Sequence, residues 1–133
     1  MLAVVDTNVL VSALINRHGS PGLVVEKIRT LELTPVVSVE ILDEYAEVLR
    51  RARFGFARQQ VDELLSDMEG LAQPIRPAPI RLVGLPHVDD AIFIAAALAA
   101  ACPIVTGNVR HFPPDAGVEI LSPAACIARL VTG

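Results

Sequence analysis

The chain has 133 residues, enough for one domain that buries a hydrophobic core without a disulfide or a structural metal. Hydrophobic residues make up 53% of it and charged residues 20%, which excludes a disordered chain. Its net charge of −4 argues against a dedicated nucleic-acid-binding protein, because such proteins carry a basic surface.

Short apolar segments alternate along the chain with longer segments of helical pattern. The first kind predicts strands at residues 2–5, 34–37, 103–106 and 118–121. The second kind predicts helices at residues 8–16, 20–31, 38–51, 57–71, 89–101 and 123–131. Ser20 and Ser38 are the predicted N-caps of the second and third helices, with Pro21 as the first residue after Ser20.

The alternation of strands and helices predicts a single α/β domain over residues 1–133, with a mainly parallel central sheet flanked by helices. Residues 72–88 interrupt this pattern, since they contain four prolines and one glycine. We predict mostly loop there, in which a short edge strand at residues 80–83 is the one regular element that fits.

The sequence also bears on the cellular compartment. No basic region precedes the first apolar run, and Asp6 interrupts that run, so it does not resemble a signal peptide. The longest apolar stretch, residues 91–102, is shorter than the about 18–20 residues of a membrane span. Cys102 and Cys126 lie in alanine-rich surroundings and are expected to be buried free thiols. We therefore expect a cytoplasmic protein without a membrane anchor.

Polar residues follow two of the predicted strands at their carboxyl ends. Asp6 comes directly after the first strand, and Asn108 follows the strand at residues 103–106. Function collects outside the carboxyl ends of parallel strands, so the two side chains are neighbours if their strands are adjacent. A helix N-cap explains Asp6 alone equally well, although Thr7 could also fill that role.

A further acidic residue, Glu44, lies in the helix predicted at residues 38–51. At about 100° per residue, Asp43 and Glu47 point away from the apolar face of this helix, whereas Glu44 lies at its border. The apolar face consists of Ile41, Leu42, Tyr45, Val48 and Leu49. Glu44 fits a functional site and, equally, a border residue paired with a nearby arginine.

Two adjacent acidic residues, Asp89 and Asp90, begin the apolar helix predicted at residues 89–101. One side chain is enough to cap a helix, so we assign the cap to Asp89 and a functional role to Asp90. A second carboxylate at a buried helix start needs a cation or a hydrogen-bond donor as its partner.

Carboxylates that converge at one sheet edge raise each other's pKa, and a divalent cation removes this conflict. All-oxygen ligands suit Mg²⁺ or Mn²⁺, and no Cys and His residues have the spacing of a zinc site. Such an ion keeps bound waters, one of which can become the nucleophile in phosphodiester cleavage. We therefore predict Asp6, Glu44 and Asp90 as metal ligands and catalytic residues, with Asn108 as an auxiliary one.

Residues 50–58 carry four arginines, no acidic residue and two phenylalanines. The arginines are Arg50, Arg51, Arg53 and Arg58. They fit a solvated helix end, which is the commoner situation. They also fit a surface that contacts RNA phosphates or a partner protein, which the interleaved phenylalanines favour slightly.

Four segments, in this order, resemble the PIN-domain family, and within it the VapC-like toxins of bacterial toxin–antitoxin pairs. They are VVDTNVLVSAL (4–14), VSVEILDEYAEVLRRARF (37–54), DDAIFIAAALAAACPIVTGN (89–108) and GVEILSPAACI (117–127). The resemblance covers nearly the whole chain. It implies a PIN fold, an endoribonuclease that depends on Mg²⁺ or Mn²⁺, an RNA substrate and a cognate antitoxin protein.

The resemblance also implies roles for single residues. The family's acidic residues correspond to Asp6, Glu44 and Asp90 of this chain. Asn8 corresponds to the residue that supports the first acidic residue, and Thr106 to a small hydroxyl residue that helps to hold the site.

The chain departs from the family pattern at the fourth acidic position. Relatives often read Thr-Gly-Asp where this chain reads Thr106, Gly107 and Asn108, and others have an acidic residue at the place of His111. His87 also replaces an acidic residue of many relatives. Asparagine offers an oxygen without a charge, so we expect weaker metal binding and a single ion rather than two.

Alternative functions follow from these departures. A catalytically weak or inactive PIN-like module would bind RNA or a partner protein without cutting. A phosphoaspartate hydrolase on a related fold is disfavoured, because it needs a second Asp where this chain has Asn8. No glycine-rich phosphate loop is present. A small chain this apolar is also expected to form a homodimer.

Overall fold

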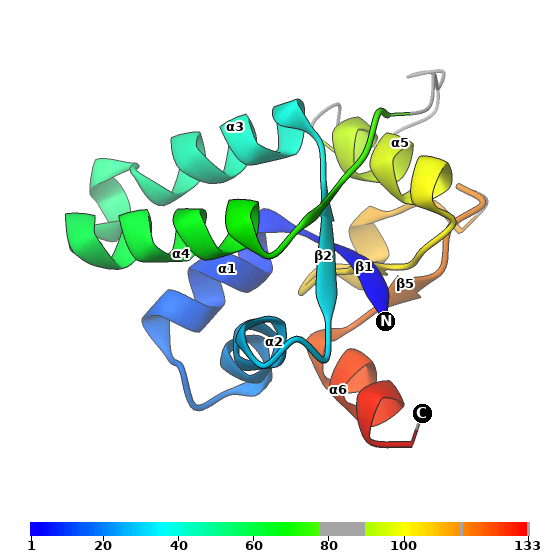
Figure 1. The fold of residues 1–133 in the computed structure, drawn as a ribbon, viewed down its shortest axis with the longest axis horizontal. Helices are drawn as coiled ribbons and strands as arrows, with labels where there is room; N and C mark the ends of the chain where they lie inside the picture. Colours follow the sequence, from blue (N-terminus) through cyan, green and yellow to red (C-terminus); the bar gives the residue numbers. More distant parts are fainter. Residues whose placement is uncertain (78–89, 115, 133) are drawn as a thin grey trace.

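The computed structural model describes residues 1–77, 90–114 and 116–132, and a parallel β-sheet lies at its centre (Figure 1). Five strands form the sheet among these residues: β1 (Leu2–Val5), β2 (Thr34–Val37), β3 (Gln73–Pro74), β4 (Ile104–Val105) and β5 (Ile120–Leu121). Their spatial order is β3-β2-β1-β4-β5, and every neighbouring pair is parallel. The predicted α/β domain with a parallel sheet is therefore confirmed.

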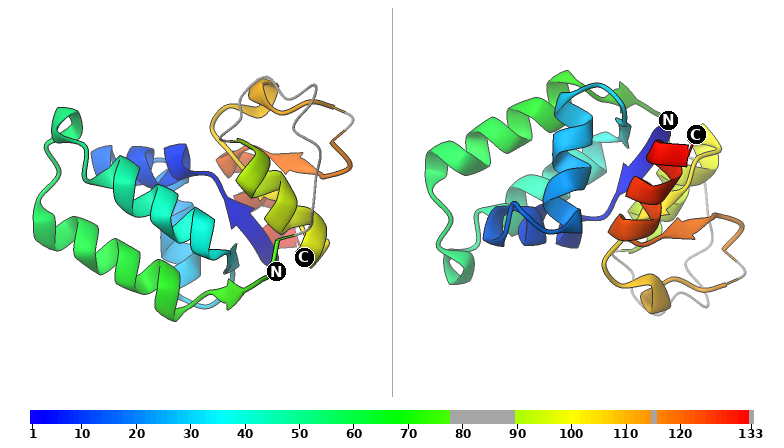
Figure 2. Two further views of the ribbon diagram at one scale, coloured as in Figure 1. Left: turned by 90° about the horizontal axis from the view of Figure 1, so that it is seen from above. Right: turned by 90° about the horizontal axis from the view of Figure 1, so that it is seen from below.

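Helices cover the sheet on both sides. They are α1 (Thr7–Ile15), α2 (Ser20–Arg29), α3 (Val39–Leu49), α4 (Arg58–Gly70), α5 (Asp90–Ala100) and α6 (Pro123–Thr132), with short 3₁₀ turns η1 (Ala52–Phe54) and η2 (Val109–His111). Helix α5 packs against β1, β2 and β4, whereas α6 packs against β5 and α2. Figure 2 shows α5 in the view from above and α6 in the view from below, so the sheet lies between them.

Strand β3 was not predicted, because its two residues are exposed and one of them is a proline. It pairs with β2 at the edge of the sheet, where Val36 lies opposite Gln73. A strand at an edge tolerates proline, since one side of it forms no ladder hydrogen bonds. The predicted strand at residues 80–83 lies outside the described residues, and so does Asp89.

In helix α2, Ser20 is already helical, one residue before the predicted first helical residue Pro21. Gly19, and not Ser20, is its N-cap, so that Pro21 occupies the second helical position, where its missing N–H is still tolerated. The next residue is Gly22, and the backbone of Arg17 lies too close to it for a side chain to fit. A Cβ atom on Gly22 would lie 2.1 Å from the carbonyl oxygen of Arg17.

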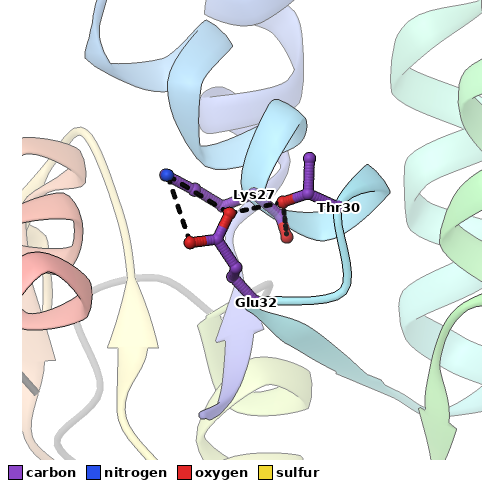
Figure 3. A network of polar contacts seen from close by, with 3 residues as sticks. All are labelled: Lys27, Thr30 and Glu32. Carbon is purple, nitrogen blue, oxygen red and sulfur yellow. Dashed lines mark hydrogen bonds and ion pairs between the residues drawn. The ribbon is translucent and has the colours of Figure 1, made fainter.

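Helix α2 ends in a left-handed turn at Leu31, whose φ angle is 67°. The Leu31 N–H donates to the Ile28 carbonyl (3.1 Å) and the Glu32 N–H to the Lys27 carbonyl (2.9 Å), which is the Schellman pattern of a helix end. Figure 3 shows the side chains that surround this turn: Thr30 Oγ1 donates to Glu32 Oε2 (2.6 Å), and Lys27 Nζ lies 3.2 Å from the same oxygen. A residue type that disfavours positive φ is thus held there by its neighbours.

The core runs between the sheet and the helices and contains most of the residues that the apolar patterns indicated. β1 contributes Ala3, Val4 and Val5, all fully buried. Cys102 and Cys126 are buried free thiols, as expected, and burial raises the pKa of both. Among the described residues, no helix has the length and apolar character needed to cross a membrane.

Candidate active site

The order of the strands defines where a site can form. β1 lies in the middle, with β2 on one side and β4 on the other, so the chain changes direction across the sheet between β1 and β4. Such a switch point opens a crevice at the carboxyl ends of the two strands. Asp6 follows β1 there, and its N–H donates to the carbonyl of Val105 in β4 (2.9 Å). β1 and β4 are therefore adjacent, and this makes Asp6 and the residues after β4 neighbours.

Asp6 is buried, with 9% of its surface exposed, and its carboxylate is held by two side chains. Oδ2 of Asp6 accepts hydrogen bonds from Thr106 Oγ1 (2.8 Å) and from Asn8 Nδ2 (3.2 Å). Asp6 occupies the N-cap position of α1, yet its side chain makes no capping hydrogen bond. Thr7 does not cap either, since it is the first helical residue and its buried Oγ1 forms no hydrogen bond among the described residues. Asp6 is therefore the N-cap of α1 by position, as one interpretation expected, but its carboxylate is engaged by Thr106 and Asn8 and not by a capping bond.

A closed network joins the two segments that flank the crevice. Asn8 Oδ1 accepts from the N–H of Gly107 (3.0 Å), and Thr106 Oγ1 accepts from the N–H of Asn108 (3.0 Å). Asn8 Nδ2 also lies 3.3 Å from Thr106 Oγ1. Because Asn8 Oδ1 and Thr106 Oγ1 accept from backbone N–H groups, the Asn8 amide and the Thr106 hydroxyl are turned to donate to Asp6, which fixes the direction in which the carboxylate points. Asn8 and Thr106 lie where the family resemblance assigned supporting residues.

The environment of Asp6 disfavours its ionised form. Burial raises the pKa of the Asp6 carboxyl above its ordinary value. The hydrogen bond from Thr106, polar interactions with the backbone of Thr7 and Asn8, and the charge of His111 act in the opposite direction but do not outweigh burial. A carboxylate buried in this way gains stability from a cation bound beside it.

Tyr45 is a site residue that the sequence did not reveal, because the helical pattern placed it among apolar core residues. Its side chain is fully buried, and its hydroxyl donates to the carbonyl of Val5 (2.5 Å), the residue before Asp6. Burial, and then the charge of Asp6, raise the pKa of Tyr45, so the hydroxyl keeps its proton. Helix α3 is thereby tied to the end of β1.

Glu44 and Asp90 belong to the helices around this crevice. Glu44 is half-buried in α3, while Asp43 and Glu47 on the same helix are exposed, as the pattern predicted. Asp90 is half-buried in the first turn of α5, which packs against β1 and α3. Figure 2 (left) shows the start of α5 beside the end of β1, with α3 on the other side. Within the described ranges, however, no three His, Cys, Asp or Glu side chains are grouped closely enough to hold a metal ion.

Asn108 and His111 lie at the two ends of the turn η2, which follows β4: Asn108 precedes it and His111 is its last residue. Both are exposed, and the N–H of His111 donates to the carbonyl of Asn108 (2.9 Å). Asn108 is the N-cap of η2 by position, without a side-chain capping bond. Its carboxamide is therefore not committed to capping the turn.

The arginines of residues 50–58 lie at the far end of α3 and α4, and acidic residues of these helices pair with three of them. Arg50 contacts Asp62 (3.0 Å), Arg51 contacts Glu47 (2.7 Å), and Arg58 lies 3.9 Å from Asp62. The guanidinium carbon of Arg53 lies 4.9 Å from the ring centre of Phe54. A solvated helix end therefore explains Arg50, Arg51 and Arg58, which pair with acidic residues of these helices. Arg53 differs, because it lies against an aromatic ring.

A cavity of about 790 Å³ lies between α1, α2 and α4 and is lined by none of the predicted acidic ligands. Apolar side chains on its wall are exposed, including Ile15 (68%) and Leu23 (43%). Charged residues such as Glu26 and Glu63 also line it. It has the mixed character of a surface for a protein segment rather than of a catalytic pocket.

Comparisons with known proteins agree with this fold. The structure resembles a chain of the complex VapBC2 from Rickettsia felis, solved bound to a DNA fragment from their promoter, with a TM-score of 0.57 and 15% sequence identity. The likeness covers 92% of this chain and 98% of that one, and it concerns the fold. No curated protein matches the sequence. Residues 3–110 match the PIN domain family, and with that match over most of its length the chain belongs to this family.

Proposed function

We propose that this protein is an endoribonuclease that cleaves RNA phosphodiester bonds with the help of Mg²⁺ or Mn²⁺. One observation carries the proposal: the buried Asp6 carboxylate stands at the switch point of the sheet and is held in one orientation by Thr106 and Asn8. Burying a carboxylate costs free energy. A cation that binds there offsets this cost.

The donor set fits a hard divalent cation. Asp6, Glu44, Asp90 and Asn108 supply only oxygen ligands from their side-chain carboxylates and carboxamide, as Mg²⁺ and Mn²⁺ prefer. Mg²⁺ is usually bound by one or two carboxylates and retains several waters, so a tight group of three acidic side chains is not required. A bound ion would neutralise phosphate charge and would lower the pKa of a water, which after losing its proton could attack phosphorus.

The chain's own residues divide the remaining tasks. Asp6 contributes the fixed carboxylate, and its oxygen Oδ2 stays with Thr106 and Asn8. Glu44 and Asp90 contribute carboxylates from α3 and α5, one of which takes the proton of the attacking water. Asn108 adds a neutral oxygen where the family pattern has a carboxylate. The site therefore carries less negative charge and binds the ion more weakly.

We further propose that the protein acts in the cytoplasm as the toxin of a toxin–antitoxin pair and is inhibited by its antitoxin protein. The similarity in fold to a VapBC2 chain supports this role. The mixed groove between α1, α2 and α4, with Ile15 and Leu23 exposed, suits an amphipathic segment of such a protein. We also propose a homodimer, which rests on the high apolar content of so small a chain.

The decisive experiment is cleavage of an end-labelled RNA in Mn²⁺ or Mg²⁺ by the wild-type chain and by single variants. We expect cleavage to stop in EDTA and to be lost in Asp6→Asn and Glu44→Gln. Asp43→Asn is the matched control for Glu44, because Asp43 precedes it on the same helix but is exposed. Equal activity of Glu44→Gln and Asp43→Asn would remove Glu44 from the site, and cleavage by Asp6→Asn would refute the proposal.

A second function is favoured by Asn108, which leaves the site with fewer charges than the family pattern. In this case the protein binds RNA or a partner protein without cutting. Retained RNA binding, with no cleavage by the wild-type chain in either ion, would support it.

A further inference from the structure

The connection between α3 and α4, residues 50–58, forms a projecting hairpin tip with a defined shape. Figure 1 shows it at the ends of both helices, away from the sheet. The turn η1 is followed by Gly55 with a φ angle of 61°, around which a Cβ atom would meet nothing within 4 Å. The rings of Phe54 and Phe56 are stacked at 5.3 Å with 8° between their planes.

The tip combines this aromatic pair with Arg53, an arginine that lies against an aromatic ring. Arg50 and Arg58 share Asp62, and Arg51 pairs with Glu47, so three of the four arginines pair with two carboxylates. Arg53 instead lies over the ring of Phe54. The tip is therefore a cationic patch in which the guanidinium of Arg53 lies over one of two stacked aromatic rings.

We propose that Arg53, Phe54 and Phe56 form a stacking subsite for an unpaired base of a single-stranded RNA substrate. Every base has a π-face, so aromatic rings and guanidinium planes bind single strands with little sequence preference. Phe56 packs against the hydrophobic core and holds Phe54 in place, which reduces the entropy lost when a base binds. Phe54 is half-buried and keeps part of its ring accessible.

The subsite follows α3, the helix that carries Glu44 of the proposed cleavage site. Glu44 lies in α3, and α3 ends at Leu49, one residue before the tip. At 1.5 Å per residue, Glu44 and Leu49 are separated by roughly 8 Å along the helix axis. Phe54 follows Leu49 by five residues, so an RNA strand bound near Glu44 would have to extend beyond the end of α3 to reach the tip. The inference rests on the proposed function, because it assumes that RNA is the substrate.

The test measures RNA binding apart from cleavage. A fluorescently labelled single-stranded oligoadenylate is titrated with protein in EDTA, and anisotropy gives the dissociation constant. Phe54→Leu is compared with Phe54→Tyr, which keeps an aromatic ring, and Arg53→Lys keeps the charge but loses the guanidinium plane. We expect Phe54→Leu and Arg53→Lys to raise the dissociation constant about tenfold and Phe54→Tyr to leave it within about twofold. Thermal unfolding of each variant verifies its fold.

The outcomes separate this inference from the proposed function. Equal binding by Phe54→Leu and Phe54→Tyr, or a wild-type chain that does not bind the oligoadenylate, overturns the subsite. A tip that binds a protein partner and not RNA would give equal oligoadenylate binding by Phe54→Leu and Phe54→Tyr. Loss of binding in Phe54→Leu, together with no cleavage by the wild-type chain in Mn²⁺, supports the subsite and contradicts the nuclease. A duplex of the same length is expected to bind all variants equally, since its bases are not available for stacking.

Discussion

The hydroxyl of Tyr45 donates a 2.5 Å hydrogen bond to the carbonyl of Val5, forty residues earlier in the chain. Val5 is the last residue of β1, and Asp6 follows it. A helix on one side of the crevice thereby fixes the backbone that carries the carboxylate. The stability of the fold and the position of Asp6 depend on the same contact.

Replacing Tyr45 by Phe removes only the hydroxyl. We expect Tyr45→Phe to lower the free energy of unfolding by about 1–3 kcal/mol, because a fully buried hydrogen bond is lost and no water can replace it. Urea denaturation of the variant and the wild-type chain measures this difference. An unchanged denaturation midpoint would show that the hydroxyl does not hold β1.

Asp6→Asn is expected to abolish cleavage while raising stability at neutral pH in the absence of metal. The pKa of Asp6 is raised by burial, so the folded chain disfavours the ionised carboxylate, and an amide of the same shape avoids that cost. Asn can still accept the hydrogen bond from Thr106. Thermal unfolding in EDTA measures the effect, and a clearly lower melting temperature of the variant would contradict it.

The raised pKa of Asp6 also determines the direction in which the stability of the protein changes with pH. Because the folded pKa of Asp6 lies above its unfolded value near 3.8, the folded chain binds more protons in that window, and Asp6 contributes less stability as pH rises through it. The surface carboxyls Glu32, Glu47 and Glu119 have lowered pKa values and act oppositely. The difference in unfolding free energy between Asp6→Asn and the wild-type chain, measured against pH, isolates Asp6 and should grow from acid towards neutral pH.

Asn108→Asp restores the charge that the family pattern has at this position. We expect the concentration of Mn²⁺ needed for half-maximal cleavage to fall several-fold, because another carboxylate faces the ion. Without metal, the added charge should lower the melting temperature, since it opposes ionised Asp6. Asn108→Ala is the control and should need more Mn²⁺ than the wild-type chain. The same Mn²⁺ requirement in all three proteins would place residue 108 outside the site.

Leu31→Gly is expected to stabilise the protein by about 0.5–1 kcal/mol. A non-glycine residue at positive φ costs about 1–2 kcal/mol, and the greater flexibility of glycine in the unfolded chain offsets part of the gain. Leu31 is 70% exposed, so little packing is lost. Leu23→Gly is the matched control, because Leu23 lies inside α2, and there glycine should destabilise by about 1 kcal/mol. Urea denaturation measures both, and a loss of stability in Leu31→Gly would refute the strain.

The sequence predicted the parts of the fold that local patterns determine. The apolar face of α3, the cap by Ser38 and the buried strands β1 and β2 are all present. β3 escaped prediction because two exposed residues contain no hydrophobic pattern, and only their pairing with Val36 and Val37 makes them a strand. The N-cap of α2 was misplaced because Gly19 and Ser20 are both acceptable caps, and only the structure, in which the Leu23 N–H donates to the Gly19 carbonyl, distinguishes them.

Some residues of the candidate site could likewise be predicted from the sequence, and others could not. Asp6 could be singled out because a carboxylate after an apolar strand is unusual, and the family resemblance pointed to Asn8 and Thr106. The hydroxyl of Tyr45 could not be found, since a tyrosine on an apolar face looks like any core residue until the carbonyl it meets is known. The roles of Glu44 and Asp90 remain predictions, because the described side chains form no three-ligand group.

The pairing of β1 with β4 has a consequence for biosynthesis. Asp6 leaves the ribosome a hundred residues before Thr106, its hydrogen-bond donor. Until then, one edge of β1 has no partner strand, and the carboxylate has no fixed direction. If the protein is the nuclease proposed above, the nascent chain stays harmless during most of its translation and becomes competent only as the last part of the sheet emerges.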